Sequence, residues 1–422
     1  MKKYDKYKQT GIEWLPRIPE HWEERKIKYC FIERSEKNHP DEEILCATQS
    51  QGVIPQSMYQ NRVVVVNKGF EGLKLVKVGD FVISLRSFEG GIEYAYYRGI
   101  ISAAYTILTP IEKQCTEYFK RLFKSKPFIQ LLQTCVTGIR EGQNINYPLL
   151  KRKQIPIPPL AEQEKIVEFL ESKTNKIDTY VAERERELQL LNELKESEIA
   201  NVITRGLNPD VKMKQCVSLL TTVSPKHWKL QRNKSFLSLS GETVGNKADQ
   251  YTLLSLTTKG VIIRDIESGK GKFPKEFDSY QIVKKDDLVF CLFDIDETPR
   301  TVGLVKNEGM ITGAYTALKV NKKLAVPEYI YYYYLCVDNI KALKPYYSGL
   351  RKTVRADKFL QLYIPLPPIE EQRAIVAYIE EKCNKVNTLI TELEAEIEYL
   401  KEYKQKLIAD CVTGQINVQS EI

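Results

Sequence analysis

Two long stretches of the chain carry apolar residues three and four positions apart, the spacing of helices that bury one face. In residues 155–208 these positions include Ile166, Leu170 and Ile177, and residues 364–422 show the same pattern. After their opening prolines, both stretches run for about forty residues without Pro or Gly. The apolar spacing predicts that both stretches form helices of an imperfect coiled coil. A helix of that length extends roughly 60 Å at 1.5 Å per residue.

The two helical stretches are copies of one sequence. Residues 155–208 and 364–417 align without a gap at an offset of 209 and share 23 identities in 54 positions. Both begin with Pro-Pro-x-x-Glu-Gln, which suits a first helical turn because proline tolerates that position and a carboxylate favours the positive end of a helix. Asn175 and Asn384 are the points at which either helix could be interrupted.

Each helical stretch follows a block with the character of a globular domain. Residues 1–154 contain strand-like apolar runs and then a helix-like stretch, and residues 209–363 repeat that order. Strands followed by a helix predict an α+β fold. The expected elements are strands at 63–66, 81–85 and 105–108 with a helix at 117–132, and strands at 288–292 and 315–318 with a helix at 328–343.

The chain is therefore interpreted as a tandem duplication with a pseudo-two-fold repeat. The expected parts are globular block 1–154, helix 155–208, globular block 209–363 and helix 364–422. The favoured arrangement pairs the two helices as an antiparallel coiled coil, a rod with a basic domain at each end. The alternative is that each helix packs only on its own globular block.

Charge alternates along these four parts. Residues 1–154 and 209–363 have net charges of +8 and +9, whereas residues 155–208 and 364–417 have −4 each. The two globular blocks are therefore expected to attract a polyanion that the helices repel. Solvated surfaces often vary by this much, so charge alone does not establish nucleic-acid binding.

Both globular blocks end with a Gly-apolar-Arg sequence and a basic cluster. Arg140 and Arg351 occupy the third position of that sequence, and an arginine on a glycine loop can contact phosphate or guanine in DNA. A surface arginine that caps a helix is the alternative. Residues 331–334 are four tyrosines in a row, for which core packing is favoured over base stacking.

Catalytic and cofactor motifs are missing from the sequence. It has no GxxxxGK[ST] phosphate loop and no GxGxxG after a strand, and its three histidines supply a poor metal or acid–base site. The nine cysteines include no CxxC pair and are expected to be reduced thiols in a cytoplasmic protein. The longest aromatic-apolar run, residues 329–337, is too short for a membrane helix. These features favour a binding protein over a catalyst.

The opening residues and the doubled helix start carry a family likeness. The sequence Tyr-Lys-x-Thr-Gly-Ile-Glu-Trp-Leu-Pro at 7–16, the Ile-Pro-Glu-His-Trp at 18–22 and the two Pro-Pro-x-x-Glu-Gln sequences resemble the specificity subunit of type I restriction–modification systems. The link Thr-Arg-Gly-Leu-Asn-Pro-Asp at 204–210 adds to the likeness, which covers essentially the whole chain. The second block departs from it, because residues 216–228 lack the Gly-Ile-Glu-Trp sequence.

The resemblance implies a division of labour. Each globular block would be a target recognition domain for one half of an interrupted site in double-stranded DNA, and each helix would be a spacer that sets the distance between half-sites. Two modification subunits with S-adenosylmethionine would methylate an adenine in each half-site, and restriction subunits with ATP and Mg would translocate and cleave the DNA. This chain would hold no catalytic residue, no metal and no cofactor.

Matching the two copies yields the candidate DNA-binding residues. Arg140 and Arg351 are the first choices, and Arg86 and Arg300 come next. The others are expected to hold phosphates: Lys151, Arg152, Lys153, Lys352 and Arg355. A coiled-coil scaffold that binds partners without DNA specificity of its own is the main alternative, and a self-sufficient nuclease or methyltransferase is a third interpretation.

Overall fold

The computed structural model describes residues 2–59, 69–111, 115–137, 144–264 and 277–420. Contacts between residues divide the chain into two compact units. The first unit contains residues 1–185 and 394–422, and the second contains residues 186–393. Each unit therefore combines one globular domain with one end of each long helix. The strand expected at 63–66 lies outside the described residues.

Both long helices are continuous. Helix α5 spans Leu160–Arg205 and helix α8 spans Ile369–Val412. The interruption expected near Asn175 and Asn384 is therefore wrong. Both asparagine side chains are exposed, and their backbone carbonyls accept ordinary bonds from hydroxyls one turn further along. An asparagine that faces solvent lowers helix propensity only slightly, and packing on either side of it holds the helix.

The helices run antiparallel in the first unit. Asp178 of α5 accepts a bond of 2.6 Å from Lys404 of α8, and Glu185 accepts one of 2.8 Å from Lys401. Residue numbers rise along α5 while they fall along α8, as antiparallel pairing requires. The same holds in the second unit, where two bonds join the helices: Lys195 to Asn387 at 2.6 Å, and Tyr378 to Glu198 at 2.5 Å.

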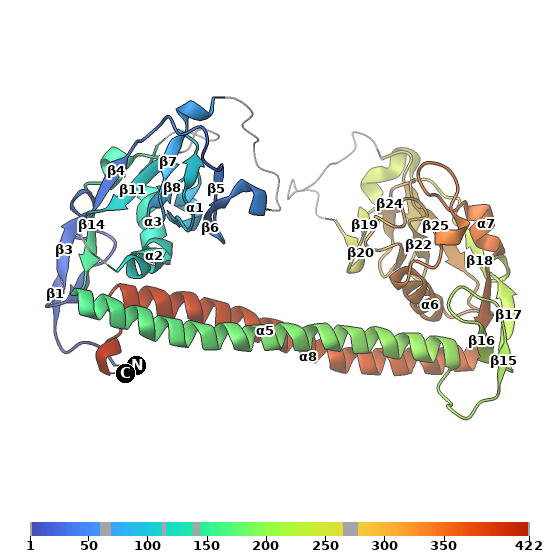
Figure 1. Cartoon of the computed structure of the whole chain (residues 1–422). Coiled ribbons are helices and arrows are strands. Elements are labelled where there is room, and N and C mark those ends of the chain that lie inside the picture. Colours follow the sequence, from blue (N-terminus) through green and yellow to red (C-terminus); the bar gives the residue numbers. More distant parts are fainter. Residues whose placement is uncertain (1, 60–68, 112–114, 138–143, 265–276, 421–422) are drawn as a thin grey trace. The chain divides into compact units, whose positions relative to one another are not determined.

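A four-stranded antiparallel sheet forms the middle of the first globular domain, in the order β4-β11-β8-β9. Its strands are β4 Phe31–Arg34, β8 Phe81–Ile83, β9 Glu93–Tyr94 and β11 Thr106–Pro110. Figure 1 shows α2 (Thr116–Lys124) between this sheet and α5. The expected helix 117–132 is divided, because α3 (Lys126–Thr134) starts after Ser125. Pro127 has no N–H to continue the first helix.

Short antiparallel pairs complete this domain. Strand β14 (Gln154–Ile157) pairs with β3 (Glu23–Lys26) and leads directly into α5, so the expected boundary at 154/155 falls inside a strand. The remaining strand pairs are β1 (Tyr7–Gln9) with β2 (Arg17–Pro19), β5 (Leu45–Thr48) with β6 (Gly52–Pro55), β7 (Lys74–Val76) with β10 (Gly99–Ile101), and β12 (Val136–Thr137) with β13 (Asn144–Ile145). The short helices are α1 (Ser87–Gly90) and α4 (Tyr147–Leu150).

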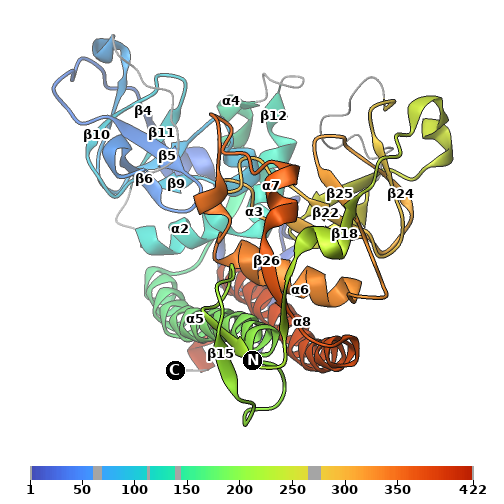
Figure 2. The same ribbon diagram turned by 90° about the vertical axis from the view of Figure 1, so that its right-hand side faces the viewer.

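The second globular domain repeats this plan. Its sheet has the order β18-β25-β22-β23, and helix α6 (Pro327–Asn339) packs on α8, as Figure 2 shows from the side. The sheet strands are β18 Leu237–Leu239, β22 Leu288–Phe290, β23 Val302–Leu304 and β25 Thr316–Val320. The other strand pairs are β15 (Met213–Gln215) with β16 (Val223–Pro225), β17 (Lys229–Arg232) with β26 (Tyr363–Leu366), β19 (Leu254–Thr257) with β20 (Gly260–Ile263), and β21 (Gln281–Val283) with β24 (Gly309–Ile311); α7 spans Ala356–Gln361.

The departure noted in residues 216–228 leaves the entry strands intact. Hairpin β15–β16 pairs Met213 with Pro225, just as β1–β2 pairs Tyr7 with Pro19. The duplication predicted from the sequence is thus confirmed, although β12–β13 is matched in the second domain only by the bridge between Ser348 and Thr353. A hairpin of backbone bonds tolerates this divergence because its register does not depend on the Gly-Ile-Glu-Trp side chains.

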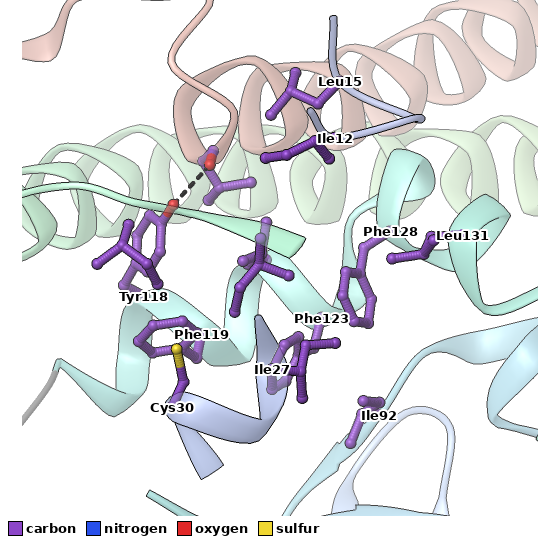
Figure 3. Packing of buried hydrophobic residues seen from close by; sticks show 14 of the residues in the cluster. Ile12, Leu15, Ile27, Cys30, Ile92, Tyr118, Phe119, Phe123, Phe128 and Leu131 are labelled. Carbon is purple, nitrogen blue, oxygen red and sulfur yellow. Dashed lines mark hydrogen bonds between the residues drawn. The ribbon is translucent and has the colours of Figure 1, made fainter. Parts of the chain in front are cut away.

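The core of each unit joins the globular domain to the ends of both helices. In the first unit, Phe119 and Phe123 of α2 pack with Phe128 of α3 (Figure 3). Buried Tyr118 donates a hydrogen bond of 2.8 Å to the carbonyl of Val412, near the end of α8. The core also contains apolar residues of α5 and α8: Ile166, Phe169, Leu170, Leu407 and Cys411.

The second unit has the equivalent contact. Tyr329 of α6 is buried and donates to the carbonyl of Ile203 near the end of α5, at 3.3 Å. Tyr333 and Tyr334 are also buried, whereas Tyr331 and Tyr332 are half-buried. The tyrosine run therefore belongs to the core, as predicted.

Replacing Tyr118 by Phe tests this link between domain and helix. The substitution keeps the ring but leaves the Val412 carbonyl without its buried donor, so we expect the first unit to lose about 1–2 kcal/mol of unfolding free energy. Urea unfolding measures this loss. Tyr97→Phe, at an exposed tyrosine of the same domain, is the control and should leave the midpoint unchanged. Equal midpoints for both variants would contradict the assignment.

Candidate nucleic-acid interface

A buried carboxylate at the start of α5 fixes the first globular domain on the helix. Glu162 is only 3% exposed, yet it lies in the first helical turn. His21 Nε2 contacts its Oε2 at 2.7 Å, and Trp22 Nε1 donates to its Oε1 at 3.1 Å. The Tyr4 hydroxyl also donates to Oε1. Three side chains from the start of the chain thus solvate one buried charge, as a buried carboxylate requires.

The second unit builds a similar junction, with the same histidine and tryptophan distances, around a glutamate that is 26% exposed. His227 Nε2 lies 2.7 Å from Glu371 Oε2, and Trp228 Nε1 donates to Glu371 Oε1 at 3.1 Å. Because His21-Trp22 and His227-Trp228 are themselves a repeat, each histidine–tryptophan pair and its glutamate form one unit of the duplication. Sequence reasoning found the doubled Pro-Pro-x-x-Glu-Gln but did not connect it with the His-Trp pairs. The lone His-Trp pair in each copy, among only three histidines, was the available signal.

The glutamine that follows each glutamate holds the domain's own helix. Gln163 accepts from the backbone N–H of Cys115, which precedes α2, and Gln372 accepts from the N–H of Val326, which precedes α6. Both glutamine amides donate back to the proline turn at 2.9 Å. The Pro-Pro-x-x-Glu-Gln sequence therefore binds the globular domain to the long helix. Its glutamate contacts the histidine–tryptophan pair, and its glutamine contacts the residue before α2 or α6.

The Gly-apolar-Arg sequence of the second domain is a tight turn. Ser348 and Thr353 pair through two backbone bonds of 3.0 and 3.1 Å, and four residues form the turn between them. Gly349 (φ +73°) and Lys352 (φ +44°) both adopt left-handed backbone conformations, and the glycine does so without steric cost. Within the described residues Arg351 forms no ion pair, and its guanidinium lies 5.6 Å from the ring centroid of Phe293.

An acidic side chain below this turn holds it in place. Asp296 accepts from the Tyr347 hydroxyl at 2.9 Å and forms ion pairs with Lys344 at 3.1 Å and Lys352 at 3.4 Å. Although partial desolvation opposes the shift, these donors lower the pKa of Asp296. Burial and the bond to Asp296 raise the pKa of Tyr347 to about 12. Lys352 is thus already paired with a carboxylate of its own domain.

Arg300 and Arg355 lie elsewhere in the second domain. Arg300 is half-buried and contacts the buried carboxylate of Asp338 at 3.4 Å, with Asn339 at 3.1 Å. Arg355 is exposed at the N-cap position of α7 and pairs with Asp357 at 3.0 Å. The structure therefore brings Arg351 and Lys352 together on one turn, with Arg355 shortly after it, and gives Arg300 an internal partner.

The basic cluster of the first domain occupies the link between α4 and β14. Lys153 pairs with Glu13 at 2.7 Å, Lys151 lies over the Tyr147 ring, and Arg152 is exposed. The backbone carbonyls of Lys151 and Lys153 accept from Lys28 and Ile27, which anchors the cluster. The phosphate role expected for these three residues stays a prediction.

Arg86 and Arg140 complete the expected set. Arg86 is exposed at the start of α1 and lies 3.8 Å from Glu89. Arg140 lies outside the described residues, between strands β12 and β13. These two strands pair on either side of it, as Ser348 and Thr353 do around Arg351.

A buried glutamate at the sheet edge of the first domain pairs with a half-buried lysine. Glu93 is 2% exposed, and Lys124 reaches its Oε1 at 2.5 Å while also donating to the carbonyls of Gly90 and Gln49. Burial raises the pKa of the Glu93 carboxyl to about 7 in spite of the lysine. The pair ties β9 to α2 and to the β5–β6 turn.

Among the described residues, the structure brings together no group of three or more His, Cys, Asp or Glu side chains that could hold a metal ion. Nor does any helix in the described ranges combine the length and apolar character needed to cross a membrane.

Comparison with known proteins gives a consistent result. The family model described as type I restriction modification DNA specificity domain matches residues 19–190 and 276–399. Among curated proteins of Methanocaldococcus jannaschii, the type I restriction enzyme MjaVIII specificity subunit is 24% identical, with 96% of this chain and 95% of that protein covered. The putative MjaX specificity subunit is also 24% identical, over 74% of this chain and 69% of that protein.

One solved structure has a similar fold. It is a chain from work on complex assembly and conformational transition of the type I R-M system, with a TM-score of 0.69 and 14% identity. The alignment covers 94% of this chain and 99% of that chain. At this identity the likeness shows the fold.

Glu162→Ala tests the junction in the first unit. The substitution leaves the buried donors of Tyr4 and Trp22 without an acceptor, so we expect the first unit to lose on the order of 3 kcal/mol of unfolding free energy. In a Trp228→Phe background, tryptophan fluorescence during urea unfolding reports this unit. The control is Glu164→Ala, two residues further along the same helix and exposed. If the two alanine variants unfold at the same urea concentration, Glu162 does not hold the domain.

Glu93→Gln tests the buried acid. The folded pKa of about 7 lies above the ordinary 4.5, so the carboxyl stabilises the fold fully below pH 4.5 and loses this contribution as pH rises through 7. Between pH 5 and pH 8 the native protein should lose unfolding free energy on the order of 3 kcal/mol through this group. The amide does not titrate, so this part of the pH dependence should be absent from the variant. Urea midpoints across that range measure it. Glu89→Gln is the exposed control, and an unaltered pH dependence in Glu93→Gln would refute the shift.

Proposed function

The chain belongs to the family of type I restriction–modification DNA specificity domains, and on this premise we propose how it acts as a specificity subunit. Each globular domain recognises one part of a two-part site in double-stranded DNA. The chain contributes sequence recognition, and partner subunits contribute the chemistry. Modification subunits with S-adenosylmethionine methylate adenine, and restriction subunits with ATP and Mg translocate and cleave the DNA.

One observation carries this proposal, namely that a matching docking junction occurs in each unit although the two globular domains differ in sequence. Glu162 and Glu371 bind their histidine–tryptophan pairs with matching distances, so both domains are held to the helices in the same way. The β5–β6 and β19–β20 hairpins and the two Gly-apolar-Arg segments differ in sequence. A constant frame with variable loops suits a protein that reads two unlike half-sites.

The acidic helices suit protein partners better than DNA. Residues 155–208 and 364–417 each have a net charge of −4, and helices α5 and α8 make up most of these ranges. DNA phosphates are repelled by such surfaces, whereas the basic domains attract them. We therefore assign modification subunits to the helices and DNA to the domains.

Methylation mapping tests the function in the cell. The chain is co-expressed with its modification subunit in a host that lacks DNA methylation of its own, and methylated bases are read directly in the host DNA. The expected result is one interrupted motif with methyladenine in both parts, absent when this chain is omitted. A stable complex that methylates nothing would contradict the proposal.

Salt titration separates specificity from a scaffold role. A specificity subunit that neutralises phosphates loses DNA affinity linearly with the logarithm of salt concentration. If the chain is a scaffold without DNA contacts of its own, the DNA affinity of the modification subunit should depend on salt in the same way with and without this chain. Family membership favours the first outcome.

Arg351→Ala tests the leading contact residue. If its guanidinium reads a base, we expect the complex to lose roughly 1–3 kcal/mol of binding free energy at the second half-site and to accept other bases there. The first half-site should keep its affinity. Competition binding with duplexes altered in one half at a time measures both effects.

The matched control is Arg373→Ala, which removes the same charge from an exposed position on α8. Equal loss on every sequence would make Arg351 a phosphate contact, and unchanged binding would remove it from the interface. Arg300→Ala is expected to lower stability instead, because it leaves buried Asp338 with one cation fewer.

A further inference from the structure

A leucine at the tip of the basic turn has no structural role in the folded chain. Leu350 is 105% exposed, so its whole side chain extends into solvent. A side chain with this exposure contributes no packing to the domain. Single exposed apolar residues are common, so exposure alone proves little. The construction of the turn beneath it is the informative feature.

The turn holds Leu350 outward on a rigid base. The carbonyl of Arg351 accepts from the N–H of Asp294 at 3.0 Å, and Val354 donates to the carbonyl of Leu292 at 2.8 Å. Lys352 keeps a left-handed backbone, which is costly for a residue with a side chain and persists only where the surroundings enforce it. The turn is thus bonded on both sides to the loop after β22.

The surroundings of Leu350 are cationic and aromatic. Arg351 follows it directly and stacks on Phe293, which in turn stacks on Tyr315 at 6.2 Å between ring centroids. Lys344, Lys352 and Arg355 lie within six residues of the tip and pair with Asp296 and Asp357. Arg351 has no ion pair within the described residues, and an apolar tip beside an unpaired guanidinium complements a base stack bordered by phosphates.

The repeat provides a second instance. Ile139 occupies the position of Leu350 in the first copy, between Gly138 and Arg140, although these three residues lie outside the described ranges. The loops of the two domains have diverged, yet an apolar residue stands before the arginine in both. That retention favours a shared use for the apolar side chain.

We propose that Leu350 is an apolar wedge that enters the minor groove and separates two stacked base pairs at the second half-site. Proteins that kink DNA insert leucine or similar side chains in this way, beside arginine or lysine on the phosphates. A wedge must be free on all sides to fit between bases, which the exposure of Leu350 satisfies. This inference rests on the proposed function and adds shape recognition to it, because flexible base steps open more easily than stiff ones.

Fluorescence of 2-aminopurine tests the wedge. The complex of the chain with its modification subunit binds duplexes of the mapped methylation motif, each with 2-aminopurine at one position of the second half-site or its flank. The methylated adenine is omitted, because base flipping by the modification subunit unstacks it. The native chain should brighten the probe at one step, since unstacking relieves quenching.

Leu350→Ala should abolish that brightening and weaken binding about tenfold, while Leu350→Met retains both. Thermal unfolding should be the same for all three chains because the side chain packs on nothing. Leu324→Ala is the matched control. Leu324 is an exposed leucine of the same domain. Its carbonyl accepts a hydrogen bond from Gln372, so it lies beside the start of α8 and not on the turn.

Other outcomes would overturn the wedge. In one, the native chain binds the site specifically but 2-aminopurine brightens at no step. In the other, Leu350→Ala brightens the probe as much as the native chain does. In both cases the proposed function stands, because sequence-specific binding persists. Absence of specific binding by the native complex would instead refute the proposed function and the wedge together.

Discussion

A carboxylate at the head of each long helix, bonded to a histidine–tryptophan pair, is the constraint on which the rest of the structure depends. Glu162 is 3% exposed and Glu371 26% exposed, so each gains from donors that the protein supplies, and Glu162 depends on them most. Those donors come from the segment that enters the globular domain, which must therefore reach the helix start in one fixed way. The neighbouring glutamines apply the same constraint to α2 and α6.

This anchoring explains how two domains can diverge without losing their frame. The four-stranded sheets keep one order, and the tyrosines at Tyr118 and Tyr329 contact equivalent carbonyls at the far ends of the helices. The surfaces away from the helices carry the differences. A family member whose loops must change to read new DNA benefits from a frame whose stability does not reside in those loops.

The parts of the fold that repeat or carry a clear periodicity could be predicted from the sequence. The duplication, the helices, their antiparallel pairing and the buried tyrosine run followed from spacing and identity. The errors have local causes. Exposed Asn175 and Asn384 do not break helices that packing holds, and Pro127 divides a helix whose apolar periodicity continues through it.

The candidate site was less accessible to sequence reasoning, because side-chain partners depend on tertiary contacts. Nothing near Arg300 in sequence reveals that Asp338, on another element, occupies its guanidinium. The link between Glu162 and Trp22 spans 140 residues and needed the fold to become visible. That Gly349 and Arg351 share one turn was predictable from the Gly-apolar-Arg sequence in both copies, whereas the exposure of Leu350 was not.

Hydrogen–deuterium exchange of the complex with its modification subunit, with and without the cognate duplex, tests the central claim most directly. The account predicts that DNA slows exchange in peptides covering 292–300 and 344–355 and leaves the helix starts at 160–175 and 369–384 unchanged. DNA-dependent protection at the helix starts, with none in the two loop peptides, would contradict it.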